Sequence, residues 1–193
     1  MLNGEVLDWL RERSSKFGDL EQREIKAVLE FTLLWSFFEL KVMKNNASIQ
    51  KFECKVEQWR SNEQLHPESF APELFYFKQR YFPDGRECHR FNGLRFRCAR
   101  HRNEGGSCDV DCPENCRDRR KFVERVLCGE NRDPRDDALA LLIIVYRLRN
   151  NLFHGVKWDY GLEDQEENFN VAGRVLRKAV EIDERVKLQA KSR

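Results

Sequence analysis

Polar side chains that could transfer protons and bind an anion stand at the end of one of the most apolar segments of the chain. The string Arg-Asn-Asn-Leu-Phe-His, from Arg149 to His154, follows the apolar run 138–146. Histidine titrates near neutral pH and can give or take a proton. The planar guanidinium of arginine is well matched to an oxyanion. Because polar groups at the end of a core helix cost free energy unless they are satisfied, exposed or functional, this segment is either a solvated helix end or a site.

A helix through this segment points its two ionisable side chains in different directions. The stripe that should pack inward is formed by Leu141, Val145, Leu148 and Leu152. Asn150 and His154 are four residues apart, so their side chains can touch. Arg149 and His154 are about 140° apart on an ideal helix. One helix alone therefore does not aim the arginine and the histidine at the same atom.

The ordinary interpretation of the segment is a solvated helix end. Asn150, Asn151 and His154 would then face water, and the histidine would interact favourably with the last carbonyls of the helix. Lys157, which follows shortly after, would be a solvated lysine. A functional interpretation therefore depends on the rest of the chain.

The periodicity of apolar residues predicts an all-α fold. The predicted helices cover residues 6–13, 20–43, 49–59, 72–82, 119–129, 134–154 and 162–188. Asp133 is placed to cap the helix that carries Arg149, Pro134 suits its first turn, and Gly155 marks its end. Residues 83–118 combine glycines, prolines, cysteines and arginines without a sustained period, so an irregular insertion is expected there. The length suits a single domain, 1–193.

The predicted helix 20–43 is rich in aromatic residues and contains one acidic residue among them. Asp19 is a plausible N-cap. A broad buried face is predicted from Ile25, Val28, Leu29, Phe31, Thr32, Leu34, Trp35, Phe38 and Val42. Glu39 follows Trp35 by four residues in this section, where an unpaired carboxylate is expensive. Glu39 therefore needs a partner or water.

The string R-x-x-x-x-H from Arg149 to His154, with Asn150 directly after the arginine, resembles the hallmark of the HEPN superfamily (higher eukaryotes and prokaryotes nucleotide-binding). The longer string YRLRNNLFHGVKW and the upstream acidic residue in FTLLWSFFELKV, Glu39, fit the same resemblance. The resemblance covers the helical chain from about residue 20 onward, without the Cys-rich insertion. It implies a bundle of four to five helices that dimerises and places two motifs in one cleft. Many members are metal-independent ribonucleases, often toxins or phage-defence effectors, while others only bind.

The resemblance also implies a role for each residue. In RNA cleavage by 2′-hydroxyl attack, one group removes the 2′ proton and another protonates the leaving 5′ oxygen, and His154 can do either. Arg149 would stabilise the phosphorane oxygens, and Asn150 would hold the imidazole or the phosphate. Glu39 would orient a basic partner across the bundle, and Lys157 would add affinity for phosphate. No carboxylate cluster beside the motif suits Mg²⁺, so neither a metal nor another cofactor is expected for the reaction.

The insertion contains most of the cysteines. Five of the seven lie between Cys88 and Cys116, with His89 and His101 beside them. The string CARH supplies one C-x2-H knuckle of the kind that zinc sites use, but the other spacings match no standard finger. A structural zinc ion and a loop of free or buried thiols are both open interpretations.

The same part of the chain is rich in arginine. Residues 80–102 contain seven arginines and two acidic residues, with Phe82, Phe91 and Phe96 interleaved. Such a strip could follow an RNA backbone and stack bases. It could equally be a solvated hairpin or loop whose arginines keep it soluble.

The composition limits the partners and the setting. Lys plus Arg number 35 against 33 Asp plus Glu, so the net charge of +2 does not by itself indicate nucleic acid, and any basic surface must be local. The longest apolar run is shorter than the roughly 20 residues that cross a bilayer, so no membrane association is expected. The odd number of cysteines and the charged N-terminal segment favour a reducing, cytoplasmic setting.

Three functions stay open at this point. The first is a dimeric HEPN-type endoribonuclease that acts on RNA as a toxin or anti-phage defence effector, controlled by an antitoxin or another partner protein. The second is a non-catalytic HEPN module that binds RNA, a nucleotide or a partner in a toxin–antitoxin or defence system. The third is a zinc-stabilised scaffold in which the Cys-rich insertion is the functional part.

Overall fold

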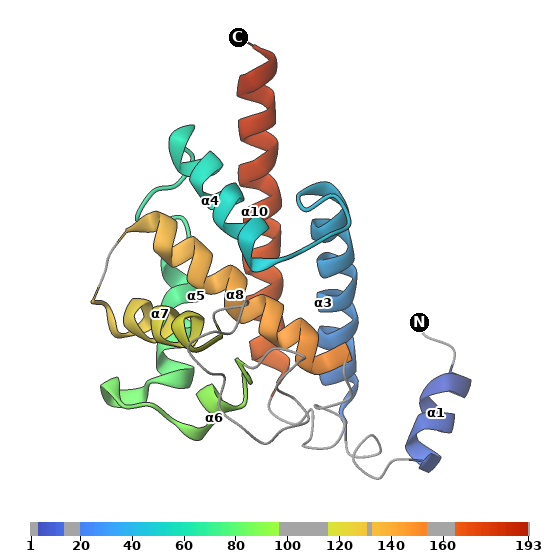
Figure 1. Ribbon diagram of the computed structural model, residues 1–193. Coiled ribbons are helices and arrows are strands. Elements are labelled where there is room, and N and C mark those ends of the chain that lie inside the picture. The colour runs from blue at the N-terminus through green and yellow to red at the C-terminus, as the bar shows by residue number, and fades with distance from the viewer. Residues whose placement is uncertain (1–3, 14–19, 97–115, 131–132, 154–164, 193) are drawn as a thin grey trace.

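The fold is all-α, as the sequence predicts, because every regular element in the described part of the chain is helical. The computed structural model describes residues 4–13, 20–96, 116–130, 133–153 and 165–192 (Figure 1). The helices are α1 (Gly4–Arg13), α3 (Gln22–Lys41), α4 (Ile49–Ser61), α5 (Ala71–Tyr81), α6 (His89–Asn92), α7 (Cys116–Cys128), α8 (Pro134–Phe153) and α10 (Glu166–Lys191), with a 3₁₀ turn at Pro83–Gly85. Within these ranges, no helix is both long and apolar enough to cross a membrane.

Helices α3 and α10 make the most extensive packing in the bundle (Figure 1). The ring centroids of Phe31 and Phe169 lie 5.1 Å apart between these helices. Gly173 permits the close approach of the two backbones, because a Cβ at this position would lie 3.0 Å from Cδ1 of Leu34. Burial of such side chains is the main favourable term in folding, about 25 cal/mol per Å² of apolar surface.

Helix α8 runs through the bundle and packs against α4 and α7. From Ala138 to Val145 every side chain is buried, as expected of a helix that is apolar on all sides. The predicted inward stripe is confirmed, because all four of its members are buried: Leu141, Val145, Leu148 and Leu152. The polar residues of α8 are confined to its first turn and to the part after Val145, so the two ends of this helix have different environments.

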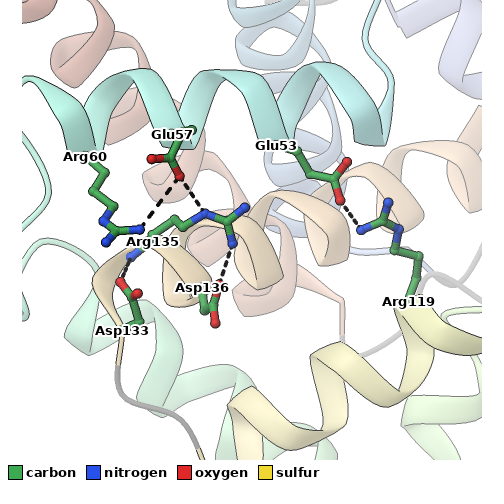
Figure 2. A network of polar contacts seen from close by, with 7 residues as sticks. All are labelled: Glu53, Glu57, Arg60, Arg119, Asp133, Arg135 and Asp136. Atoms are coloured by element: carbon green, nitrogen blue, oxygen red, sulfur yellow. Dashed lines mark hydrogen bonds and ion pairs between the residues drawn. The ribbon is translucent and has the colours of Figure 1, made fainter.

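Charged residues attach the first turn of α8 to α4 (Figure 2). Nε of Arg135 donates to Oε2 of Glu57 at 3.0 Å, and Nη1 of Arg135 donates to Oδ1 of Asp136 at 2.6 Å. A parallel ion pair joins Arg119 of α7 to Glu53 of α4. The start of α8 is therefore fixed by arginines that each have a carboxylate partner.

The helix ends agree only in part with the predictions. Asp133 caps α8 as predicted, because its carboxylate accepts a hydrogen bond from a backbone N–H of the first turn at 2.9 Å. The N-cap of α3 is Glu21 and not Asp19, and the backbone N–H of Glu21 donates to the carboxylate of Glu24 at 3.0 Å. The buried face predicted for α3 is also too broad, since Leu29 is exposed. Asp19 itself lies outside the described residues.

The described part of the insertion, residues 83–96, packs onto the bundle and includes the short helix α6. The ring centroids of Phe82 and Phe91 lie 4.8 Å apart, and those of Phe91 and Phe96 lie 5.3 Å apart. All three rings are buried. The prediction that they could stack RNA bases is therefore wrong, because they already form part of the core. The remainder of the insertion, 97–115, lies outside the described residues.

Candidate functional site

The candidate site lies where the C-terminal part of α8 meets α3. Of the residues predicted from the sequence, Arg149 and Asn150 lie near the end of α8, and Glu39 lies near the end of α3. His154 and Lys157 fall outside the described residues. The structure therefore places the anion-binding part of the predicted site, and the proton-transferring histidine stays a prediction.

The guanidinium of Arg149 is held by aromatic rings and an amide. Its Cζ atom lies 5.6 Å from the ring centroid of Trp35 on α3 and 4.9 Å from that of Phe153 on its own helix. Its Nη1 donates a hydrogen bond to Oδ1 of Asn150 at 3.1 Å. Among the described residues Arg149 forms no ion pair, and its buried Nε has no hydrogen-bond partner. Cation–π contacts hold the charge in place while the guanidinium keeps donors for another acceptor.

Glu39 fixes the tryptophan ring that contacts Arg149. Nε1 of Trp35 donates to Oε2 of Glu39 at 3.0 Å, and the backbone N–H of Ala47 donates to Oε1 at 3.2 Å. The carboxylate needed a partner, and the indole and the backbone supply it. Glu39 thus acts on Arg149 through Trp35, and no basic side chain in the described ranges is paired with it.

Two further polar residues attach the end of α8 to the segment that follows α6. Nδ2 of Asn151 donates to the carbonyl oxygen of Gly93 at 2.9 Å, and Nε of Arg147 donates to that of Leu94 at 3.1 Å. Asn151 is buried, so the interpretation that it faces water is wrong. Its place beside Leu152 of the inward stripe is the signal that could have indicated burial. These contacts fix the direction in which Arg149 leaves the helix.

The segment that receives these hydrogen bonds also places arginines at the surface close to the site. Arg90 lies on α6, Arg86 precedes that helix, and Arg95 directly follows Leu94, and all three are exposed. Exposed positive charge beside an anion-binding group raises the local concentration of a polyanion. The arginine strip expected from the sequence is therefore present at the surface in its described part, without the stacking rings.

No group of three or more His, Cys, Asp or Glu side chains among the described residues could hold a metal ion. The cysteines placed there, Cys54, Cys88 and Cys128, are free thiols. Most of the predicted zinc ligands, including His101, belong to 97–115, outside those ranges. The zinc interpretation of the insertion therefore stays a prediction.

Comparison with known proteins adds no relative. No family model, no curated protein and no solved structure matches the chain. The resemblance to the HEPN superfamily consequently rests on the string from Arg149 to His154 and on the upstream Glu39. What the site can do has to be argued from its own geometry: a half-buried guanidinium, two aromatic rings and an amide that together can bind an anion.

Proposed function

We propose that the chain is a HEPN-type endoribonuclease that cleaves RNA without a metal ion. The observation that carries the proposal is the environment of Arg149, whose guanidinium lies near Trp35 and Phe153 without a carboxylate among the described residues. A charge removed from water normally has an opposite charge beside it, because isolated burial is costly. An arginine without such a partner suits a ligand that brings the negative charge, as a phosphodiester does.

Cleavage in this proposal follows the 2′-hydroxyl route. The 2′ oxygen forms a bond to phosphorus as its proton passes to a base, and the bond from phosphorus to the 5′ oxygen breaks as that oxygen receives a proton. The products are a 2′,3′-cyclic phosphate and a 5′-hydroxyl. His154 is assigned to proton transfer, because imidazole exchanges protons near neutral pH. Arg149 is assigned to the charge that builds on the non-bridging oxygens.

The other predicted residues support Arg149 or the substrate. Asn150 accepts a hydrogen bond from the guanidinium and so limits its orientation. Glu39 holds the indole of Trp35 and thereby the surface on which the guanidinium rests. Lys157 adds affinity for phosphate. Exposed arginines on and around α6 extend the positive surface along which a single-stranded RNA can lie.

A second copy of the chain completes the site in this proposal. Arg149 and His154 diverge by about 140° on one helix, so a single chain does not bring both to one phosphate. A two-fold axis presents the same patch twice, and the arginine of one copy can then meet the histidine of the other. The active species is therefore a homodimer. A strict monomer with full activity at micromolar concentration would exclude this part of the proposal.

The biological role that fits such an enzyme is that of a cytoplasmic toxin or anti-phage defence effector. A freely active ribonuclease would destroy the RNA of the cell that makes it. An antitoxin or another partner protein is therefore expected to control the activity. Co-expression with the genuine partner should suppress the loss of cellular RNA that expression of the chain alone produces.

A non-catalytic module is the second candidate, and one observation favours it. The guanidinium of Arg149 is already ordered by Trp35, Phe153 and Asn150, so it can hold a phosphate without any proton transfer. Such a module would bind RNA, a nucleotide or a partner protein in a toxin–antitoxin or defence system. It predicts binding that survives the loss of His154.

Incubation of the purified protein with total RNA in EDTA tests the proposal. Cleavage should persist in EDTA, should yield 2′,3′-cyclic phosphate ends, and should disappear in a His154→Ala variant prepared in parallel. RNA binding without cleavage by the wild type would support the binding module. Cleavage that requires added Mg²⁺ or Mn²⁺ would show that the proposal of a metal-independent enzyme is wrong.

A further inference from the structure

The outer face of α3 carries a continuous stripe of exposed apolar side chains. The exposed fractions are 37% for Leu29, 71% for Leu33, 46% for Phe37 and 54% for Leu40. Spaced by four, four and three positions, these residues lie within an arc of about 80° on an α-helix. The arc is opposite to the side on which Trp35 is buried. These four residues are called the α3 stripe below.

The other described residues leave the α3 stripe uncovered. Helix α10 packs against a different side of α3, where Leu34 approaches Gly173. In Figure 1, α1 lies to the right of the lower end of α3 and not along its length. Isolated apolar residues at a surface are common, whereas a contiguous apolar patch marks an interaction surface. The α3 stripe is contiguous, so it calls for an occupant.

We infer that the α3 stripe joins two copies of the chain as an antiparallel pair of helices. The stripe is symmetric about its centre. When Leu33 of one copy lies opposite Phe37 of the other, Leu29 of the first falls opposite Leu40 of the second. Every apolar residue then covers an apolar residue, and the two-fold axis repeats both contacts.

Charges beside the stripe favour the antiparallel direction. Glu30 and Lys41 lie on the same flank of the stripe, about 20° apart around the helix. In an antiparallel pair this flank meets the same flank of the other copy, so Glu30 falls beside Lys41 and Lys41 beside Glu30. In a parallel pair Glu30 would face Glu30 of the other copy. The Nζ atom of Lys41 lies 5.7 Å from the ring centroid of Phe37, so the charge borders the stripe itself.

The size of the contact sets the strength to expect. A standard interface buries about 800 Å² on each partner, and one helix face is smaller than that. Within its own chain Glu30 also lies 3.7 Å from Lys26, so its charge is shared between two lysines in the pair. The dimer should therefore have a dissociation constant in the micromolar range, within reach of sedimentation.

This contact is separate from the proposed ribonuclease site. The α3 stripe and Trp35 face opposite sides of α3, so pairing through the stripe leaves the surface around Arg149 free. The inference therefore does not rest on RNA cleavage. An inactive chain can pair through α3, and an active chain can fail to do so.

Sedimentation velocity over a range of concentrations tests the inference with a Leu33→Asp variant, which places a charge at the centre of the stripe. Self-association should weaken by about tenfold or more, as for a residue at the centre of an interface. Phe75→Asp is the matched control, because Phe75 is 64% exposed on α5, and this variant should sediment as the wild type does. Equal self-association of Leu33→Asp and the wild type would overturn the inference, as would a wild type that is monomeric at every concentration.

Charge reversal tests the direction of the pair. Glu30→Lys alone and Lys41→Glu alone should each weaken self-association by about threefold to tenfold, because each places like charges beside one another at the rim. The double variant restores opposite charges in the antiparallel arrangement and should associate as the wild type does. A double variant as weak as the two single variants would exclude the antiparallel pair.

Discussion

The two ends of α8 hold their arginines in different ways. At the start of the helix, Arg135 donates to Glu57 and to Asp136, and its charge is matched by carboxylates (Figure 2). Near the other end, Arg149 rests close to aromatic rings, donates to the amide oxygen of Asn150 and has no carboxylate partner among the described residues. The same residue type thus occurs on one helix with a partner and without one.

The difference separates a structural charge from one that can bind a ligand. An arginine paired with carboxylates has its donors occupied, and the pair fixes two helices relative to each other. An arginine held by ring faces keeps donors free, because a ring attracts the cation without accepting its N–H groups in the plane. Each prediction below changes one end of α8 or a comparable charge elsewhere, and they are ordered from the largest expected effect to the smallest.

Loss of the motif should have the largest effect, on activity. His154→Ala and Arg149→Ala should each lower the rate of RNA cleavage by about 10² or more, the size expected for a general acid or base. Thermal unfolding should stay close to that of the wild type in both variants, because both residues lie off the inward stripe of α8. Intact cleavage in His154→Ala together with early unfolding would instead make the histidine a structural cap.

Leu148→Ala is the control that separates packing from chemistry at the same end of α8. Leu148 is buried one residue before Arg149, and its truncation should lower the free energy of unfolding by roughly 2 to 5 kcal/mol. Denaturant unfolding measures this change. A Leu148→Ala variant as stable as the wild type would show that the end of α8 is not packed as described.

A buried carboxylate with complete pairing should matter for stability alone. Asp183 on α10 accepts from Lys55 at 2.8 Å and from the indole of Trp59 at 3.1 Å, and Lys187 lies 2.7 Å from its second oxygen. Asp183→Asn should cost about 3 kcal/mol of unfolding free energy, because it leaves the lysines facing a neutral amide. RNA cleavage by the folded variant should be unchanged.

The same carboxylate gives the protein a defined sensitivity to acid. Burial alone would raise the pKa of Asp183, but hydrogen bonds from Lys187, Lys55 and Trp59 outweigh it and hold the pKa below its ordinary value. A depressed pKa in the folded state contributes stability above the unfolded pKa, and this contribution is lost as the pH falls through the folded pKa. Unfolding curves measured from neutral to acidic pH should therefore fall more steeply for the wild type than for Asp183→Asn. Parallel curves would contradict this account of the cluster.

A charge-conserving change at Arg149 should have an intermediate effect. Arg149→Lys keeps the positive charge but loses the planar fork and the second donor direction. Partial cleavage activity would indicate that Arg149 acts as a point charge, and complete loss would indicate a two-point clamp on phosphate. Activity equal to that of the wild type would exclude a clamp.

Removal of one partner at the other end of α8 should have the smallest effect. Glu57→Gln takes away the carboxylate shared by Arg135 and Arg60, and both side chains are partly exposed. The free energy of unfolding should fall by about 1 kcal/mol or less, because pairs of this kind are screened by water. Cleavage should not change. A large loss of activity would mean that the start of α8 takes part in the reaction.

Local patterns in the sequence were enough to predict the helices and part of the site. Apolar spacing identified the inward stripe around Leu148, and the cost of a carboxylate among aromatic residues indicated that Glu39 needs a partner. That partner, Trp35, is four residues away on the same helix, which is the distance at which helical periodicity gives reliable contacts.

Contacts between distant segments could not be predicted in the same way. The bond from Asn151 to Gly93 and the pairing of Asp183 with Trp59 join residues far apart in the chain, and neither has a spacing that periodicity can detect. The buried face of α3 was predicted too broadly because α3 is apolar on both sides: one side faces the core, and the other, with Leu33 and Phe37, faces outward. A single sequence does not tell these sides apart, because apolar spacing is the same whether the cover comes from the same chain or from another molecule.

Binding of an uncleavable RNA to variants at the two ends of α8 tests the central claim most directly. A 2′-O-methyl oligonucleotide lacks the attacking hydroxyl, so its affinity reports the anion site alone, measured at one low salt concentration. Arg149→Gln should weaken binding by about tenfold or more, because a charge-assisted hydrogen bond is worth about 1.5 to 3 kcal/mol. Arg135→Gln, which removes the same charge from the other end of α8, should bind as the wild type does. Equal affinity of the wild type and Arg149→Gln would contradict the account.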